Sequence, residues 1–435
     1  MSCSPTHVRR YLAVACVAGA IGCHRAEPPP SLGALAQQYV KLVLATGVHN
    51  SDEVDMFYGP PEWQREAATK RASIMDIQRG TANLVDGLSS LPPAADTGLE
   101  RRRQNLLIQA NALRRYLDVL SGTHLSFDEE SRSVYGLAAP LIDDASLGAL
   151  VDKLDGALPG VGPVAARLER FTDALTVPPD RMPAVVDAAL KACRAQTAEH
   201  LPLPEKEHVE IAYVHDRPWS AYARYQGAFT TRIEINIDLP RRPDQILDLM
   251  CHEGYPGHHV QYSLLEARFV GERGWVEYQI APFFSPASAL AEGAATAAVD
   301  VAFSPGEREA FERDRLFPIA GLAASSVAAV ENVRAITNRL SVAGAEAARR
   351  YLDGRMDRPS AISWLERYGA MPRPTELLAF VGRYRSYVVG YTVATSAVWN
   401  YVNAGRNNSD ARWSKYEDVI MDPAGAGWLQ GRSMK

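Results

Sequence analysis

Residues 251–261 read Cys-His-Glu-Gly-Tyr-Pro-Gly-His-His-Val-Gln, and they place three imidazoles and a carboxylate within eight positions. The residues before them, 246–250, carry apolar side chains at helical spacing, which predicts a helix that runs into His252 and Glu253. Pro256 then interrupts this helix, because proline lacks the amide hydrogen that an interior helical position donates. Four ligand-type side chains around a helix break indicate a metal site.

The spacing of the histidines excludes an unbroken metal-binding helix. In zinc hydrolases with an HExxH helix, the two histidines lie four positions apart on one face, and the glutamate after the first acts as general base. Here His258 follows His252 by six positions, which turns its ring about 120° away on a regular helix. His259 returns to nearly the same face, but it lies about 10 Å farther along the axis, too far for one ion.

Pro256 and Gly257 offer a solution to this conflict. Proline would clash with the carbonyl of His252, and glycine tolerates almost any backbone conformation, so we expect a bulge that loops out two residues. His258 then becomes the second ligand, while His259 faces the substrate cleft or supports a ligand. The alternative is a set of unrelated histidines in a Pro-Gly turn.

The best candidate for a third protein ligand is Glu292, in the alanine-rich segment 287–300. The small side chains of this predicted helix allow it to pack closely against another backbone, and Glu292 is the only acid between Glu277 and Asp300. Asp300 is a candidate partner for an imidazole ligand. A solvated surface carboxylate is the alternative for Glu292, although its apolar flanks argue against it.

The pattern His-Glu-x-x-Pro-Gly-His-x-x-Gln at 252–261, with Glu-Gly-Ala at 292–294, resembles the family known as domain of unknown function 885. The chain also looks like a distant relative of the gluzincin metallopeptidases, which include carboxypeptidase Taq and thimet oligopeptidase. The resemblance covers most of the mature chain. It implies general base catalysis by Glu253 and one Zn²⁺ ion on His252, His258 and Glu292. The family's Glu-Gly-Trp-Ala is Glu-Gly-Ala-Ala here, so we expect a differently shaped cleft at that point.

A second motif of the same family lies near the C-terminus. Residues 386–390, Ser-Tyr-Val-Val-Gly, resemble the family's Ser-Tyr-x-x-Gly, where the hydroxyl of Tyr387 would donate to a tetrahedral oxyanion. Arg383, one helical turn earlier, is a candidate to bind a substrate carboxylate through two parallel hydrogen bonds, and Arg385 is a weaker one. The alternatives are arginines paired with structural acids and tyrosines packed in the core.

Residues 208–239 contain the β-branched, alternating segments of one small sheet, whereas the rest of the chain has helical patterns. We therefore predict a mainly helical protein with an N-terminal helical lobe at 31–207 and a metallohydrolase lobe at 208–435, and the resemblance implies a gluzincin-like fold with a central cleft. The resemblance to gluzincins, in which an extended edge segment before the zinc helix pairs with the substrate backbone, implies this role for the segment that contains Tyr225 and Gly227; an ordinary hairpin is the alternative.

The N-terminus is predicted to direct export. Arg9 and Arg10 precede a short apolar run, so residues 1–22 are expected to be a signal peptide. Ala-Ile-Gly-Cys at 20–23 resembles a bacterial lipobox, which favours a periplasmic or outer-membrane lipoprotein lipidated at Cys23, with 23–30 as a linker. A plain signal peptide is the alternative. The formal net charge of −5 argues against a nucleic-acid partner, and no membrane contact beyond the lipid anchor is expected.

Two cysteines, Cys193 and Cys251, remain in the mature chain beyond Cys23. They allow one disulfide bond in an oxidising compartment, but we expect two buried free thiols instead.

Three functions are compatible with these patterns. The first is a zinc-dependent hydrolase of peptide bonds, of the carboxypeptidase or oligopeptidase type. The second is a non-proteolytic zinc hydrolase of another amide or an ester, and the third is a catalytically silent lipoprotein that binds peptides. A closed site with four protein ligands would favour the third function, whereas a position left for water favours the first two.

Overall fold

The computed structural model of the chain describes residues 1–2, 31–217, 219–404 and 408–429. The predicted lipidation site Cys23 and the linker 23–30 lie outside the described residues, as does nearly all of the predicted signal peptide. Helices dominate the described part, and its strands form two small sheets, so the predicted mainly helical fold is confirmed. None of the described helices has both the length and the apolar character needed to cross a bilayer.

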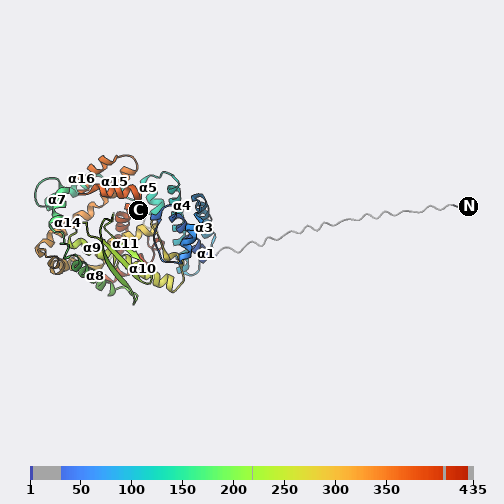
Figure 1. Ribbon diagram of the computed structural model, residues 1–435. Coiled ribbons are helices and arrows are strands. Elements are labelled where there is room, and N and C mark those ends of the chain that lie inside the picture. Colours follow the sequence, from blue (N-terminus) through green and yellow to red (C-terminus); the bar gives the residue numbers. More distant parts are fainter. Residues whose placement is uncertain (3–30, 218, 405–407, 430–435) are drawn as a thin grey trace.

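Four helices form one end of the molecule, drawn in blue in Figure 1. They are α1 (Leu32–Gly47), α2 (Pro61–Lys70), α3 (Ile74–Ser90) and α4 (Thr97–Leu120). Three of them begin at a side chain that accepts a hydrogen bond from a backbone N–H of the first turn, which stabilises the helix end: Ser31, Ser73 and Asp96. Their apolar faces share one core, which includes Leu35, Leu84 and Leu117.

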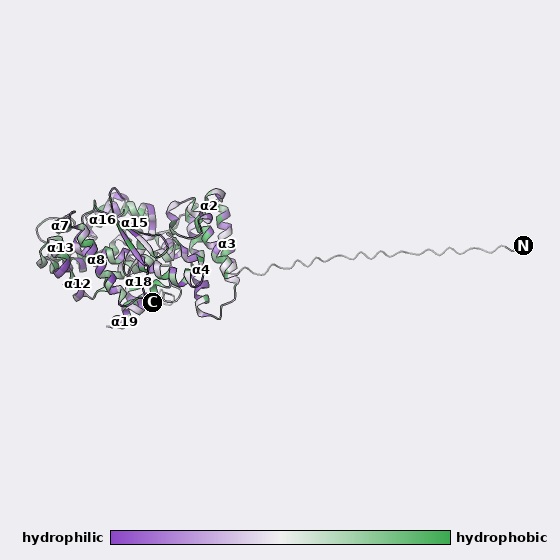
Figure 2. Ribbon diagram, turned by 60° about the horizontal axis from the view of Figure 1, so that its bottom comes forward, coloured by the Kyte–Doolittle hydropathy of each residue, from purple (hydrophilic) through white to green (hydrophobic). Residues whose placement is uncertain are grey.

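A second group of helices begins at the opposite end, where Figures 1 and 2 show α7, and extends through α16 and α15 toward the middle of the molecule. It consists of α6 (Asp144–Ala157), α7 (Val164–Ala174), α14 (Val327–Leu340), α15 (Val342–Leu352) and α16 (Arg358–Tyr368). Their buried side chains, such as Leu154, Leu340 and Trp364, form a separate cluster.

The remaining helices include two that were not predicted, α5 (Phe127–Tyr135) and α19 (Ser409–Ile420). The others are α8 (Met182–Ala198), α9 (Pro243–Glu253), α10 (His258–Leu265), α11 (Pro286–Ala302), α12 (Pro305–Phe311), α13 (Phe317–Ala320), α17 (Pro374–Tyr384) and α18 (Thr395–Asn403). Two short segments, η6 (Arg385–Val388) and η7 (Gly390–Ala394), join α17 to α18.

The predicted sheet is present and has three strands, β2 (His208–Val214), β3 (Ala221–Tyr225) and β4 (Thr230–Asn236). Its order is β2-β4-β3, with β2 parallel and β3 antiparallel to β4, so β3 is an edge strand. A second sheet pairs β1 (Val54–Phe57) with β5 (Ile280–Pro282) and was not predicted.

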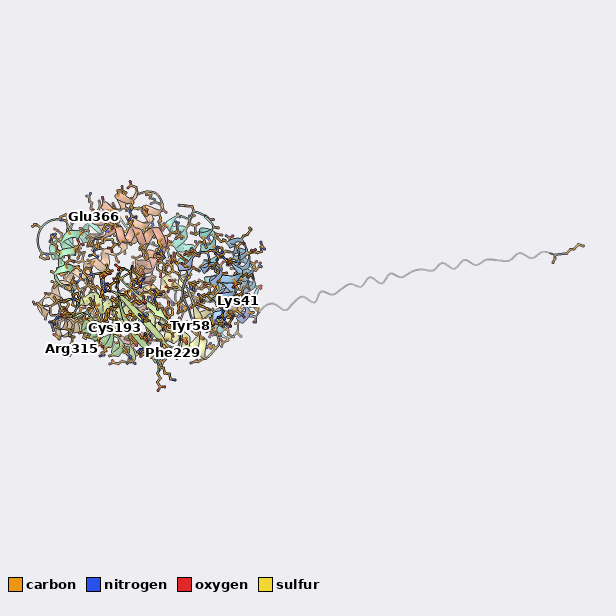
Figure 3. All side chains as sticks on the ribbon, viewed as in Figure 1. Lys41, Tyr58, Cys193, Phe229, Arg315 and Glu366 are labelled. Carbon is orange, nitrogen blue, oxygen red and sulfur yellow. A yellow bond between two sulfur atoms is a disulfide. The ribbon has the colours of Figure 1, made fainter. Side chains whose placement is uncertain are left out.

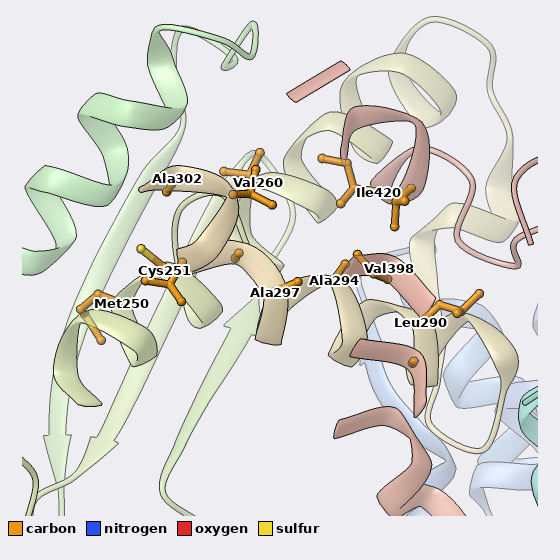
Figure 4. Close-up of a cluster of buried hydrophobic side chains, with 14 of the residues drawn as sticks. Met250, Cys251, Val260, Leu290, Ala294, Ala297, Ala302, Val398 and Ile420 are labelled. Carbon is orange, nitrogen blue, oxygen red and sulfur yellow. The ribbon is translucent and has the colours of Figure 1, made fainter. Parts of the chain in front are cut away.

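Helix α11 lies at the centre of the largest core. Figure 4 shows it between Met250 and Cys251 of α9 on one side and Val398 of α18 and Ile420 of α19 on the other. Alanines and a glycine line this helix, and a Cβ added at Gly293 would lie 2.6 Å from the Cβ of Ala394. The close packing expected of the small-residue helix is therefore present, and it holds Glu292 at a fixed depth in the core.

Cys193 of α8 (labelled in Figure 3) and Cys251 of α9 are joined by a disulfide bond, with their Cα atoms 5.5 Å apart. The prediction of two free thiols is wrong, because α8 and α9 pack side by side and bring both side chains to the same point of the core. The predicted N-terminal lobe ends at residue 207. The core around the disulfide bond contains residues from both sides of this position, for example Tyr116 and Trp428.

Candidate metal centre

His252, His258 and Glu292 form the candidate metal centre. They come from the end of α9, the first residue of α10 and the middle of α11, and one ligand atom of each lies within 4.8 Å of the others. The Nε2 atom of His252 is 3.6 Å from Oε2 of Glu292, and Nε2 of His258 is 3.6 Å from Oε1. The three side chains predicted as ligands therefore converge.

His252 and His258 come together because the helix is interrupted between them, and not through the predicted two-residue bulge. Helix α9 ends at Glu253, a turn follows at 254–257, and α10 begins at His258; the Tyr255–Pro256 peptide bond is cis. The Gly257 N–H donates to the carbonyl of Cys251 at 3.0 Å, and a Cβ on Gly257 would lie 1.8 Å from the carbonyl oxygen of His252. Only glycine fits this turn without displacing His258.

The geometry of the three side chains suits a divalent metal ion. Metal–ligand bonds of about 2.0–2.2 Å in a tetrahedral zinc site separate the ligand atoms by about 3.4 Å, close to the 3.6 Å seen between each imidazole and Glu292. Among the described residues, the buried Oε2 of Glu292 has no hydrogen-bond partner. A buried carboxylate oxygen without a partner is costly, and a bound cation would satisfy it.

The charges around the site also favour a cation at its centre. Burial opposes protonation of His258, but Glu292, Glu253 and Asp55 together raise its pKa to about 9. Burial lowers the pKa of His252 to about 4, with the charge of His258 acting in the same direction and Glu292 against it. The site thus stabilises a positive charge on His258 but not a second one on His252. This is expected where several carboxylates surround a small space.

Glu253 lies beside this centre as the HExxH pattern requires. Its side chain is buried, and burial raises the pKa of its carboxyl group to about 7, although the charge of His258 and the backbone N–H of Ala223 in β3 act in the opposite direction. A carboxylate with a pKa near neutrality both accepts and releases a proton readily at physiological pH.

Two residues that were not predicted belong to the site. Asp55 of β1 accepts a hydrogen bond of 2.6 Å from the hydroxyl of Tyr222 and acts electrostatically on His258. The Tyr391 hydroxyl interacts with Glu292 and lowers the pKa of that carboxyl group, as do both histidines, against the effect of burial. Tyr391 follows the predicted Tyr387 by one helical turn, and this spacing in the sequence could have marked it as a candidate. Nothing in the sequence points to Asp55.

His259 does not face the cleft. It is fully buried, with Nδ1 at 2.8 Å from Oγ1 of Thr231 and Nε2 at 3.0 Å from Oε2 of Glu207. Glu207 also accepts hydrogen bonds from Tyr255 and Arg194, so both ring nitrogens of His259 are held in a structural network. The prediction that His259 binds substrate is wrong, because α10 begins at His258 and turns the next residue into the core.

The two predicted substrate-binding arginines are paired with acids of the protein. Arg383 makes two hydrogen bonds of 2.7 Å to Asp52, and Arg385 donates to Glu130 at 2.6 Å. In both arginines the Nε and Nη2 donors are directed to residues that are distant in the sequence, an arrangement that does not favour their predicted role as substrate ligands. Asp300 likewise approaches Arg334, at 3.8 Å, instead of an imidazole ligand.

The structure gives the predicted tyrosines and glycine other contacts. The Tyr387 hydroxyl lies 2.8 Å from Oγ of Ser288, and its ring is buried against Phe283, an arrangement that does not favour an oxyanion role. The Tyr225 hydroxyl donates to Glu266. Gly227 lies in the turn after β3 with a φ of +79°, so it is not part of an extended edge; Tyr225 is the last residue of that edge.

A small cavity of about 70 Å³ borders the site. Tyr262, whose ring stacks on His258 at 6.2 Å between centroids, forms part of its wall, together with Ala291, the neighbour of Glu292. Most of its remaining lining is apolar, for example Met56, Leu106 and Ile280.

Comparisons with known proteins place the chain in no established family. No family model matches it, and no curated protein does. A solved structure described as "the putative lipoprotein from Colwellia psychrerythraea" is similar over 91% of this chain and 69% of that chain, with 14% identity and a TM-score of 0.48. The resemblance to the domain of unknown function 885 family stays a prediction.

Proposed function

We propose that the chain is a zinc-dependent hydrolase that cleaves peptide bonds. The observation that carries this proposal is the convergence of His252, His258 and Glu292 with the buried carboxylate of Glu253 beside them. Two imidazoles and one carboxylate are a ligand set of catalytic zinc sites, which leave one position for water or substrate.

Bound zinc would supply Lewis-acid activation of a water molecule and of the substrate carbonyl. Glu253 accepts a proton from the attacking water and then delivers it to the nitrogen of the departing amine, so that the amide C–N bond breaks and one water is consumed. The raised pKa of Glu253, about 7, suits both halves of this transfer. Tyr391 holds Glu292 in place through its hydroxyl.

The edge of β3 favours peptides over other amides. Ser220 and Gln226 hydrogen-bond to β4 on either side of the strand, so by alternation the N–H and C=O groups of Ala221, Ala223 and Tyr225 point away from the sheet. The Ala223 N–H is directed to the carboxylate of Glu253, so a peptide beside the candidate base would pair with the remaining edge groups of the strand. An extended peptide would add to such an edge through main-chain hydrogen bonds.

The second candidate function, hydrolysis of another amide or an ester, would use the same groups and differs only in the substrate. A silent peptide-binding protein is less favoured, since the described cluster offers three metal ligands and not the four of a closed structural site. The proposal of export, with a lipid anchor at Cys23, rests on the sequence pattern alone.

Removal of the base tests the proposal. In Glu253→Gln, proton transfer is lost, and we expect kcat for a peptide substrate to fall by about 10²–10⁴-fold with metal content unchanged. The exposed Glu199→Gln is the matched control and should keep full activity. Chelation should abolish activity, and added zinc should restore it. Full activity in Glu253→Gln and after chelation would refute the proposal.

A further inference from the structure

The small cavity beside the candidate metal centre lies where α1, α4, the sheet of β1 and β5, α10 and α11 meet, and its volume is about 70 Å³. No step of the proposed hydrolysis uses it. One face of α4 forms the wall that is contributed by this helix, with side chains at helical spacing: Arg102, Asn105, Leu106 and Gln109. Met56 of β1 and Ile280 of β5 add to this wall.

Two helices carry both a candidate metal ligand and a part of the cavity wall. In α10, Tyr262 follows His258 by one helical turn, and the two rings are stacked with 6.2 Å between their centroids and 15° between their planes. In α11, Ser288 precedes Glu292 by one turn, and Ala291 is the direct neighbour of Glu292. Residues three or four apart on a helix have Cβ atoms about 5–6 Å apart, so the cavity begins about one side chain away from the candidate ligands.

The wall next to the candidate ligands is more exposed than the wall opposite. Tyr262 and Ser288 are half-buried, whereas Leu106 is 3% exposed and Ile280 is 5% exposed. This difference indicates that the cavity opens toward the candidate metal centre and ends at Leu106 and Ile280. A side chain of a substrate residue next to a metal-bound carbonyl can therefore enter it.

The cavity offers a ligand a mainly apolar surface, because the polar groups of its wall are paired within the protein. The pairs are Arg102 with Glu277, Asn105 with Asp422, and Ser288 with Tyr387. Among the described residues of the wall, only Gln109 has a buried side-chain atom, Oε1, without a hydrogen-bond partner. A charged side chain that entered the cavity would lose its hydration without gaining a free partner of opposite charge, whereas the transfer of an apolar side chain from water is favourable.

The volume limits the size of the side chain that fits. A cavity of about 150 Å³ accommodates a benzene ring. At about 70 Å³, the cavity has room for a branched aliphatic group and not for a phenyl ring. Valine and leucine have side chains of this kind.

We propose that this cavity binds the side chain of the substrate residue next to the scissile bond, and that the enzyme therefore selects peptides with valine or leucine at that position. This inference rests on the proposed function. It assigns the choice of substrate to Leu106, Ala291 and the other residues of the cavity wall.

The test gives the zinc-loaded protein N-acetylated pentapeptides that differ only in their central residue, which is glycine, leucine or phenylalanine. Mass spectrometry locates the cleaved bond, which we expect next to the central residue. Because burial of the leucine side chain is favourable, kcat/KM should be about 10–100-fold higher for the leucine peptide than for the glycine peptide. The phenylalanine peptide should be cleaved at least about tenfold less efficiently than the leucine peptide, because its ring is too large.

Two variants change the size of the cavity in opposite directions. Leu106→Ala removes three carbon atoms from the inner wall, so kcat/KM should rise by at least about tenfold for the phenylalanine peptide and fall for the leucine peptide. Leu113→Ala is the matched control, because Leu113 lies on the same helix, is also 3% exposed and does not line the cavity; it should keep the order of the three peptides. Ala291→Val fills the cavity and should reduce the leucine peptide to the level of the glycine peptide.

A binding measurement separates this inference from the proposed function. Calorimetry with the amides of N-acetyl-glycine, N-acetyl-leucine and N-acetyl-phenylalanine should show the tightest binding for leucine in wild type and for phenylalanine in Leu106→Ala. If no peptide is cleaved, the proposed function fails, and the order of binding alone decides the role of the cavity. The inference is overturned if wild type binds the leucine and glycine amides equally well. It is also overturned if Leu106→Ala or Ala291→Val changes the leucine and phenylalanine compounds by the same factor, since that is the result of a general loss of packing.

Discussion

At the scale of single residues, Glu207 shows how a buried carboxylate organises the region next to the metal centre. Its side chain is 2% exposed and binds His259, Tyr255 and Arg194, which come from three different elements of the chain. Burial alone would raise the pKa of Glu207, but the hydrogen bonds from His259, Tyr255 and Arg194 lower it to about 2. The network thus fixes the turn between the two histidine-bearing helices.

The ionised Glu207 predicts a specific acid sensitivity. A carboxyl group with a pKa of about 2 in the folded protein and 4.5 in the unfolded chain stabilises the fold above pH 4.5, and this contribution is lost as the pH falls toward 2. Its size is on the order of 3 kcal/mol. We expect Glu207→Gln to flatten the free energy of unfolding between pH 5 and about pH 2, measured by urea titration. The exposed Glu205→Gln should leave the decrease of the free energy of unfolding at acid pH unchanged. An unchanged decrease in Glu207→Gln would contradict the role given to Glu207.

The two candidate histidine ligands and the candidate base could be predicted from the sequence, whereas most substrate-binding candidates could not. His252, His258 and Glu253 lie in one short stretch, where helix geometry and the Pro-Gly pair restrict the possible arrangements. Arg383, Arg385 and His259 are paired with Asp52, Glu130 and Glu207, respectively. These acids are distant in the sequence, and only the tertiary structure brings them near. Asp55 escaped notice for the same reason, because an isolated charged residue carries no local signal.

At the scale of elements, the turn at 254–257 is the feature on which the site depends. Helix α9 presents His252 and Glu253 at its end, and α10 presents His258 at its start, so a short turn replaces the second half of a continuous metal helix. Long helices such as α4 (Thr97–Leu120) follow directly from their apolar periodicity. The strands β1 and β5 have four and three residues and pair across more than two hundred positions, so no local pattern reveals them.

A single methyl group at this turn should separate the two histidines. In Gly257→Ala, the new Cβ would lie 1.8 Å from the carbonyl of His252, so the turn has to open and His258 moves away from Glu292. We expect zinc affinity to fall by at least about tenfold, measured by competition with a chromogenic chelator. Gly306→Ala, where no atom lies within 4 Å of the added Cβ, is the matched control and should bind zinc normally. Normal affinity in Gly257→Ala would show that the turn does not position the ligand.

At the scale of the whole molecule, the metal centre joins parts of the chain that are far apart in the sequence. Helices α9, α10 and α11 supply the candidate ligands, β1 supplies Asp55, η7 supplies Tyr391, and β3 contacts the candidate base. The disulfide bond between α8 and α9 ties the first ligand's helix to the preceding half of the chain. Because one ion would bridge three helices of the central core, metal binding should stabilise the whole fold.

The central claim is that His252, His258 and Glu292 bind one divalent metal ion, and metal analysis of the purified chain tests it most directly. After reconstitution with zinc and dialysis, the account predicts one zinc per chain in wild type and in His215→Gln, whose histidine is exposed and paired with Asp238. It predicts none in His258→Gln, with the circular dichroism spectrum of wild type retained. Folded wild-type protein without zinc, or zinc retained in His258→Gln, would contradict it.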